Sequence, residues 1–264
     1  MNAEDNFFKT YNFMISVIIL SCNNEKTIQA TLDSVKLFSE VLLFDTGSKD
    51  KTLEIAKNYS NVKILSSTFI PFGKLRNIAA SSATNDWILS IDSDEVLSKS
   101  LENEILNLPL KENTVYKIFR LNFYNGKQIK TCGWYPEKCI RLYNRNTTSF
   151  NTAFVHEGIN ITNHKVLELK YPLYHYPYED VEAFLKKMSL YAALFAEENF
   201  LLKKSSIFKA VSHGVFHFLR SYLFRLGFIQ GKEGFIISWY QGTSAFYKYL
   251  KLWEKGQNSK IVKN

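Results

Sequence analysis

The sequence predicts an α/β protein with a parallel sheet in its first hundred residues and a helical region at its end. In the first hundred residues, short apolar runs alternate with segments whose apolar residues recur at helical spacing, and short links join these segments. After about residue 179 only helical spacing remains. The chain has 264 residues, of which 46% are hydrophobic and 15% aromatic, so it can bury a substantial core and is not a disordered protein.

The first part alternates strand and helix. Short apolar runs predict strands at residues 16–20, 41–44 and 87–91, and a further strand is expected at residues 62–65. Helices are expected between them at residues 28–35, 51–59 and 73–83, with Asn23 and Asn24 as caps of the first. Such alternation with short links indicates right-handed crossovers and parallel strands.

The pattern changes after Leu108. Residues 115–124 and 137–143 alternate like half-buried strands, Asn125-Gly126 is a hairpin-type turn, and shorter β segments are expected at 154–161 and 166–169. Helices are expected at 181–200, 207–226 and 235–253. We therefore expect an α/β domain over residues 1–178 and a helical appendage over residues 179–264.

Charge is distributed unevenly. The formal net charge is +8, and residues 201–264 hold eleven Lys and Arg against two Glu, so the remainder is close to neutral. This basic region is rich in Phe, Tyr and Trp, a composition that suits an anionic membrane surface, and no nucleic-acid motif is visible. A purely structural helical cover over the sheet is the alternative for the aromatic residues.

Targeting features and cysteines point to the cytoplasm. Residues 1–11 lack the basic-then-apolar order of a signal peptide, and no window supplies the roughly 20 apolar residues of a membrane span. Cys22, Cys132 and Cys139 have no metal-type spacing and are expected to be reduced thiols. The expected location is cytoplasmic, peripheral on the inner face of the cytoplasmic membrane.

The apolar run 87–91 ends in the carboxylates Asp92, Asp94 and Glu95. Strand alternation would turn Asp92 and Asp94 the same way, at the sheet edge where open α/β sheets bind ligands. Two such oxygen ligands suit Mg²⁺ or Mn²⁺ when a substrate diphosphate supplies the others. A solvated acidic turn is the alternative.

A second carboxylate, Asp45, ends the run 41–44 and is expected at the same edge as Asp92. It can accept hydrogen bonds from a ribose or a base, and Gly47 lets the chain turn tightly beneath a ligand. Ser48 and Asp50 are interpreted as a helix-capping turn.

Arg76 lies in the first turn of the helix predicted at residues 73–83, just before the strand that ends in the carboxylates. It can clamp a diphosphate with forked hydrogen bonds, although an ordinary surface arginine is the alternative.

Histidines offer one candidate site. His156-Glu157 follows an apolar pair. A Glu in a partly buried site, such as Glu157, can act as a general base, and the adjacent His156 can orient a ligand or bind metal. An ordinary polar strand end is the alternative. His213 and His217 lack the Glu of a zinc-protease motif and are interpreted as packing residues, and His175 as a core residue.

The ordered set formed by the 16–20 strand, the Asp45-x-Gly-Ser turn, Arg76-Asn77 and Asp92-Ser-Asp-Glu95 resembles the inverting family 2 glycosyltransferases with a GT-A fold. Three later pieces resemble the subgroup that builds lipopolysaccharide or lipooligosaccharide cores, often by β-glucosyl transfer onto heptose. These pieces are residues 155–158, 174–176 and 226–235.

The resemblance implies a function and a site. The expected reaction moves one sugar, glucose from UDP-glucose, onto a lipid-linked glycan, and the missing Gln-x-x-Arg-Trp motif of processive synthases argues for a single addition. It implies Glu157 as catalytic base and a Mg²⁺ or Mn²⁺ at the diphosphate held by Asp94 and Asp92, and the position of His156 beside Glu157 makes it a further candidate metal ligand. The implied donor-binding residues are Ser21, Asn23, Glu25, Asp45, Gly47, Arg76, Asp92 and Ser93.

Two other functions stay open. An apolar strand ending in Asp-x-Asp also resembles the nucleophile loop of haloacid dehalogenase-type phosphatases, and the basic region alone would suit a non-catalytic membrane adaptor. The sequence leaves the donor sugar, the acceptor, the linkage and the oligomeric state undetermined.

Overall fold

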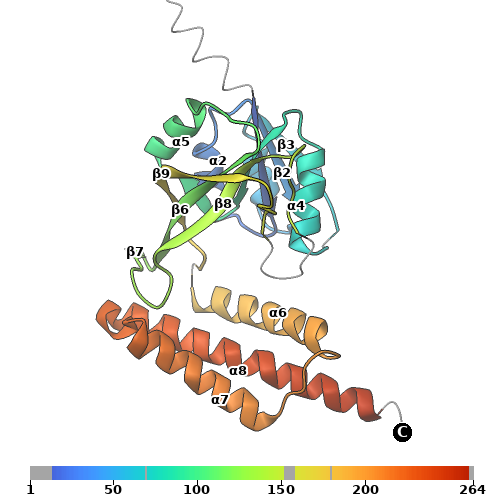
Figure 1. Cartoon of the computed structure of the whole chain (residues 1–264), viewed down its shortest axis with the longest axis vertical. Helices are drawn as coiled ribbons and strands as arrows, with labels where there is room; N and C mark the ends of the chain where they lie inside the picture. Colours follow the sequence, from blue (N-terminus) through green and yellow to red (C-terminus); the bar gives the residue numbers. More distant parts are fainter. Residues whose placement is uncertain (1–13, 69, 152–157, 179, 262–264) are drawn as a thin grey trace, which may run out of the picture. The chain divides into compact units, whose positions relative to one another are not determined.

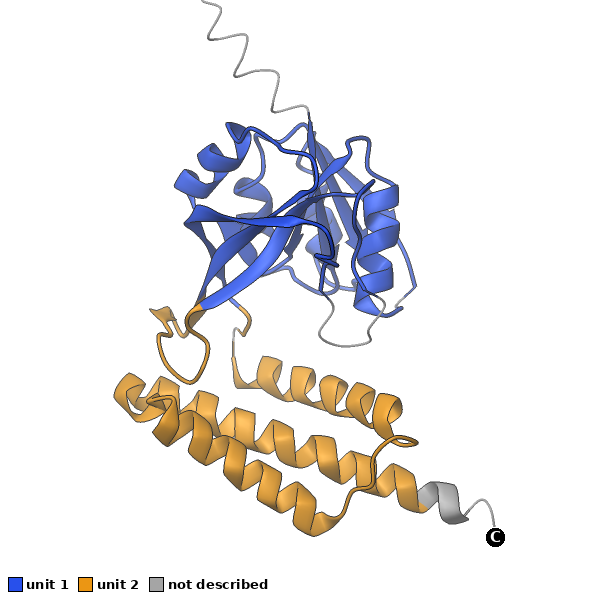
Figure 2. Ribbon diagram, in the orientation of Figure 1, with its two compact units in different colours: residues 1–121, 137–176 blue, residues 122–136, 177–264 orange. Residues whose placement is uncertain are grey.

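The computed structural model describes residues 14–68, 70–151, 158–178 and 180–261, with side chains described up to residue 257. The chain forms two compact units (Figure 2). Unit 1 comprises residues 1–121 and 137–176, and unit 2 comprises residues 122–136 and 177–264. Unit 2 thus includes a segment from the middle of the chain in addition to the C-terminal helices.

Unit 1 is built on the predicted parallel sheet. The strands β1 (Ile15–Ser21), β2 (Glu40–Asp45), β3 (Val62–Ser66) and β4 (Trp87–Asp92) lie in the order β3-β2-β1-β4 and are parallel. Figure 1 labels β2 and β3 of this sheet. The four predicted strands are confirmed to within two residues at each end. Buried apolar runs locate β1, β2 and β4 because both faces of the sheet are covered there, whereas β3 at the sheet edge is half exposed.

The sheet continues beyond β4 with antiparallel strands. The next strands in space are β8 (Glu137–Asn144), β6 (Thr114–Tyr124), β9 (Lys165–His175) and β5 (Glu95–Leu97), and β7 (Lys127–Gln128) pairs with β6. The strands expected from alternation are confirmed. The three-residue strand β5 was not predicted, because it is too short to show a period.

Helices cover both faces of the sheet. One face packs against α2 (Ile28–Asp33), α3 (Thr52–Ala56) and α5 (Lys99–Leu106), and the other packs against α4 (Phe72–Ser81). Alternate residues of each strand reach opposite faces, so neighbours in β1 belong to different cores. The predicted capping of α2 is wrong, because its N-cap is Thr27 and makes no side-chain cap bond.

Unit 2 consists mainly of three helices, α6 (Val181–Asn199), α7 (Ile207–Leu219) and α8 (Gly231–Ile261). A π-helical turn, η1 (Arg220–Phe224), continues α7, and a 3₁₀ turn, η2 (Gly227–Gln230), leads into α8. The helix α8 packs against both α6 and α7. Within the described part of the chain, no helix has the length and apolar character needed to cross a membrane.

Candidate active site

The carboxyl ends of three parallel strands meet at one edge of the unit 1 sheet. Ser21 of β1 lies opposite Asp45 of β2, and Leu20 lies opposite Asp92 of β4. The expectation that Asp45 and Asp92 share an edge is confirmed. The ends of these strands and the loops that follow them carry most of the predicted site residues.

The loops after β1 and β2 are joined by reciprocal hydrogen bonds. Ser48 Oγ accepts the Asn23 N–H at 2.9 Å, and Asn23 Oδ1 accepts the Lys49 N–H at 2.8 Å. Asp50 Oδ2 accepts the Glu25 N–H at 3.0 Å. Asn23 and Glu25, which were predicted to bind the sugar donor, therefore lie in two loops that hydrogen bonds hold together at the sheet edge.

Asp45 shapes the second loop. Its buried carboxylate accepts the N–H groups of Gly47 at 2.9 Å and Ser48 at 3.0 Å. Gly47 has φ +113°, which side chains disfavour, and a Cβ placed there would meet nothing within 4 Å. The loop thus leaves open space directly above its backbone, as a ligand lying against this edge requires.

Asp92 lies between two buried arginines at the tip of β4. Arg76 of α4 donates to Asp92 Oδ1 and, at 2.7 Å, to Ser90 Oγ, two residues earlier on the same face of the strand. Arg141 of β8 donates to Asp92 Oδ2 at 2.7 Å. Burial alone would raise the pKa of Asp92, but Arg141 and Arg76 hold it well below its usual range.

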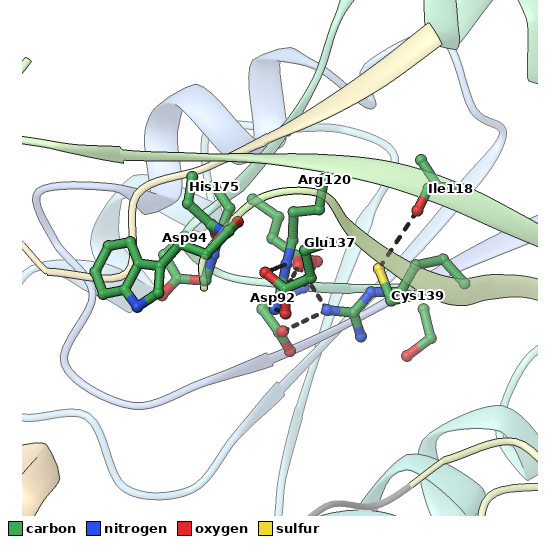
Figure 3. A network of polar contacts seen from close by, with 12 residues as sticks. Asp92, Asp94, Ile118, Arg120, Glu137, Cys139 and His175 are labelled. Carbon is green, nitrogen blue, oxygen red and sulfur yellow. Dashed lines mark hydrogen bonds and ion pairs between the residues drawn. The ribbon is translucent and has the colours of Figure 1, made fainter. Parts of the chain in front are cut away.

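The ion pairs extend into the antiparallel strands. Glu95 Oε1 accepts from Arg141 at 2.5 Å and from Arg120 at 2.8 Å, while Glu95 Oε2 accepts the Asp92 N–H at 2.9 Å. Arg120 also donates through Nε to Glu137 at 3.1 Å. Three arginines and three carboxylates thus alternate along one chain of contacts, part of which Figure 3 shows.

Asp94 has different surroundings from Asp92. The strand β4 ends at Asp92, and Ser93 and Asp94 form a tight turn into β5, so the predicted strand alternation does not extend to Asp94. Asp94 Oδ1 lies 3.5 Å from Nε2 of His175 on β9 (Figure 3). Ser93 is buried, and its carbonyl accepts the Thr31 hydroxyl at 3.0 Å.

The donor set at this turn fits a divalent cation that is shared with a substrate. Asp94 offers a carboxylate and His175 an imidazole, both donors for Mn²⁺ or Mg²⁺, whereas both Asp92 oxygens already have arginine partners. Among the described residues no group of three or more His, Cys, Asp or Glu converges on one point. A cation held here would therefore take its other ligands from the diphosphate and from water.

Two of the predicted residues, His156 and Glu157, lie outside the described part of the chain. Arg76, predicted as a diphosphate clamp, uses the two guanidinium contacts given above to hold Ser90 and Asp92. His175, interpreted from the sequence as a core residue, lies at the site. Arg120 and Arg141 were not predicted as site residues; only the charge of a lone arginine within each predicted strand pointed to them.

A family model described as glycosyl transferase family 2 matches residues 16–169, which include both edge loops and the ion-pair chain. The chain belongs to glycosyl transferase family 2. An uncharacterized glycosyltransferase of Rickettsia typhi is 30% identical over 94% of this chain and 89% of its own length. The lipopolysaccharide core biosynthesis glycosyltransferase LpsC of Rhizobium meliloti is 24% identical over 91% of this chain and 92% of its own.

Solved structures that match include those of S. aureus TarS. The match to TarS 1–349 in complex with UDP-GlcNAc has a TM-score of 0.46 and 17% identity, over 94% of this chain and 92% of that chain. A second TarS structure matches at a TM-score of 0.43 and 22% identity, and there the aligned region spans only 40% of the TarS chain.

Family membership has two consequences. The resemblance to family 2 and the GT-A fold expected from it are confirmed, since the strand order and the helices on both faces of the sheet belong to the region that the family model matches. The protein is therefore a glycosyltransferase, and the phosphatase and adaptor alternatives are set aside.

Proposed function

We propose that this glycosyltransferase moves one glucose from UDP-glucose, with inversion, onto a heptose of a lipopolysaccharide or lipooligosaccharide core. The observation that carries the proposal is the similarity to LpsC, a lipopolysaccharide core glycosyltransferase, which runs through nearly the whole of both chains. The missing processive motif supports a single addition. The lipid-linked acceptor would place the enzyme at the inner face of the cytoplasmic membrane.

The donor is proposed to lie along the carboxyl edge of β1, β2 and β4. The uridine would contact the joined loops that contain Ser21, Asn23, Glu25 and Asp45, where the backbone above Gly47 is open. The diphosphate would lie at the turn of Ser93 and Asp94. Asp94 would hold the divalent cation, which screens the charge of the leaving diphosphate, and His175 is the described side chain best placed to join it.

An inverting displacement needs a base on the side opposite the leaving group. The acceptor hydroxyl oxygen forms the new bond to the anomeric carbon as the bond to the diphosphate breaks, and its proton passes to a carboxylate. Glu157 is proposed as that base. Asp92 is unsuited to it, because two arginines hold its pKa well below its usual range and the base must be protonated in this step.

The test is a donor screen that measures UDP release with Mg²⁺ or Mn²⁺, followed by transfer to a heptose-terminated lipid acceptor. The expected result is slow hydrolysis of UDP-glucose alone and faster turnover when the acceptor is added. Preference for another UDP-sugar would overturn the glucose assignment. Turnover that does not respond to the heptose acceptor would overturn the acceptor assignment.

A further inference from the structure

The helix α7 exposes most of its large apolar side chains. Apart from Phe218, whose ring lies 5.7 Å from that of Trp239, the side that packs on α8 is mostly small or polar. Ala210 is fully buried, and a Cβ on Gly214 would come within 3.3 Å of the Gly242 carbonyl. In η1, which continues α7, the Ser221 hydroxyl lies 2.9 Å from that of Ser238. His213 stacks on Tyr249 at 3.9 Å. A soluble helix normally buries its large apolar residues instead.

Large apolar side chains occupy the opposite side of α7. Phe208 is 83% exposed, and Val215 and Leu219 follow at helical spacing on the same side. Exposed apolar residues continue through η1 and η2, with Phe224 at 80% exposed. We call this set the α7 face. Its members are Phe208, Val211, Val215, Phe216, Leu219, Leu223, Phe224, Leu226, Phe228 and Ile229.

The charge around the α7 face has one sign. No Asp or Glu occurs between Glu198 and Glu233, and that stretch contains six Lys and Arg. Lys204, Arg220 and Lys232 are exposed. The first acidic residue after the stretch, Glu233, is buried and paired with Lys127 at 3.1 Å, so it does not offset this charge at the surface.

We propose that the α7 face docks in the plane of an anionic lipid bilayer, with its aromatic and aliphatic side chains at the boundary between headgroups and acyl chains. A continuous apolar face of this kind marks an interaction site, and an interfacial helix combines such a face with flanking basic residues. The charge selects the occupant, because a second copy would bring the same positive charge against this face whereas anionic headgroups complement it. The inference rests on the proposed function and deepens it by naming the surface that would hold the enzyme on the membrane that carries the acceptor.

The experiment is sedimentation of the full chain with vesicles of phosphatidylcholine alone or of an equal mixture with phosphatidylglycerol, without sugar donor. The full chain is expected to bind the mixed vesicles and to release as salt rises. Phe208→Ser with Phe216→Ser should weaken binding roughly ten-fold or more, because two aromatic side chains that would enter the bilayer interface are lost. Lys204→Gln with Arg220→Gln should weaken it several-fold and reduce its salt dependence.

The matched control is Leu37→Ser with Tyr171→Ser, which removes two exposed apolar side chains of unit 1 and should leave vesicle binding unchanged. Urea unfolding of each variant establishes that it is folded. Equal binding to both vesicle types, no binding to the mixed vesicles, or unchanged binding of the Phe208 and Phe216 variant would overturn the proposal. So would a dimer in lipid-free solution that this variant dissociates. Because no donor is present, the result is independent of the sugar-transfer assay.

Discussion

Glu95 is the most enclosed carboxylate of the candidate site. Its side chain is fully buried, and it accepts from Arg120, from Arg141 and from the Asp92 N–H. It therefore fixes both the arginine that holds the Asp92 carboxylate and the backbone at the point where the strand β4 turns. Glu137 binds the same Arg120 from a partly exposed position, with 37% of its side chain accessible.

Glu95→Gln and Glu137→Gln form a matched pair. Glu95→Gln removes the negative charge beside the buried Arg141 and the mostly buried Arg120, so we expect it to lower the free energy of unfolding by roughly 3 kcal/mol. Glu137→Gln should cost less than about 1 kcal/mol, because water screens that contact. Urea unfolding measures both values. Equal losses would show that burial does not set the strength of these ion pairs.

Asp94 is predicted to be needed for metal-dependent turnover. Asp94→Asn should abolish UDP release that depends on Mg²⁺ or Mn²⁺ and leave unfolding little changed, since Asp94 lies outside the arginine chain described above. His175→Gln is expected to raise the metal concentration needed for half-maximal activity by roughly 10- to 100-fold. Full activity of Asp94→Asn at unchanged metal dependence would contradict this assignment.

Glu157 is predicted to be the general base. Glu157→Gln keeps the side-chain shape and removes its basicity, so UDP affinity should persist while transfer falls by roughly 10²–10⁴-fold. The readouts are UDP binding and the transfer rate at several pH values. Asp180→Asn is the comparison, because Asp180 caps α6 by accepting the Ala183 N–H at 2.8 Å, and its transfer rate should stay near that of the unchanged enzyme. The reverse result would move the base to Asp180.

At the scale of single elements, the sequence predicted the buried strands but not the ion-pair chain of arginines and carboxylates. Residues 87–91 are apolar because the strand β4 is covered on both faces, so the pattern itself shows the strand. The ion-pair chain depends on how β4, β8 and β6 pair. A register shift between Tyr116 and Lys117 changes which residues of β6 lie opposite those of β8. The alternating pattern of the sequence does not show where such a register shift falls.

The helix α5 was not predicted, although its sequence contains a signal for the start of a helix. Ser98 caps it by accepting the Leu101 N–H at 3.2 Å, and Leu101 and Ile105 are buried at helical spacing. A capping residue before two apolar residues four positions apart is a standard helix start. The short strand β5 before it lacks any such signal, because three residues cannot define a period.

At the amino ends of the parallel strands, opposite the candidate site, the Glu40 carboxylate makes contacts whose strength depends on pH. Glu40, the first residue of β2, accepts from the Ser16 hydroxyl at 2.5 Å, from the Thr84 N–H at 2.7 Å and from Lys63 at 3.0 Å. Burial alone would raise the pKa of Glu40, but these hydrogen bonds outweigh it and lower the pKa to about 2. The carboxylate thus joins β1 and β2 to the segment that precedes β4.

Because the pKa of Glu40 is lowered on folding, its stabilisation is fully present above its unfolded value near 4.5 and is lost as the pH falls toward about 2. Glu40→Gln should therefore lower the free energy of unfolding at pH 7 by on the order of 2 kcal/mol. The difference from the unchanged protein should shrink between pH 4.5 and pH 2. Urea unfolding across this range tests it, with Glu168→Gln as the exposed control, and a difference independent of pH would contradict the assignment.

At the scale of the whole molecule, the sequence indicated a helical appendage but not the segment 122–136 that belongs with it. That segment lies between two strands of unit 1, so its composition gave no reason to separate it. In unit 2 it is held by the C-terminal helices: the Cys132 N–H donates to the Arg225 carbonyl at 2.9 Å, and Gln241 donates to the Cys132 carbonyl at 2.9 Å. Tyr124 packs edge-on against Phe184 of α6, with ring centroids 5.0 Å apart.

A chain cut after residue 178 should therefore not behave as an independent domain, even though the sequence favours a boundary there. Removing α6 and α8 exposes Ile129 and Cys132, which are fully buried, and leaves Tyr124 without Phe184. We expect the fragment 1–178 to bind a hydrophobic dye and to aggregate at concentrations where the full chain stays dispersed. A second fragment in which residues 122–136 are replaced by a short Gly-Ser link should bind less dye, because it lacks the orphaned segment. If the unmodified fragment 1–178 were dispersed and dye-free, the segment 122–136 would have to be stable without the helices.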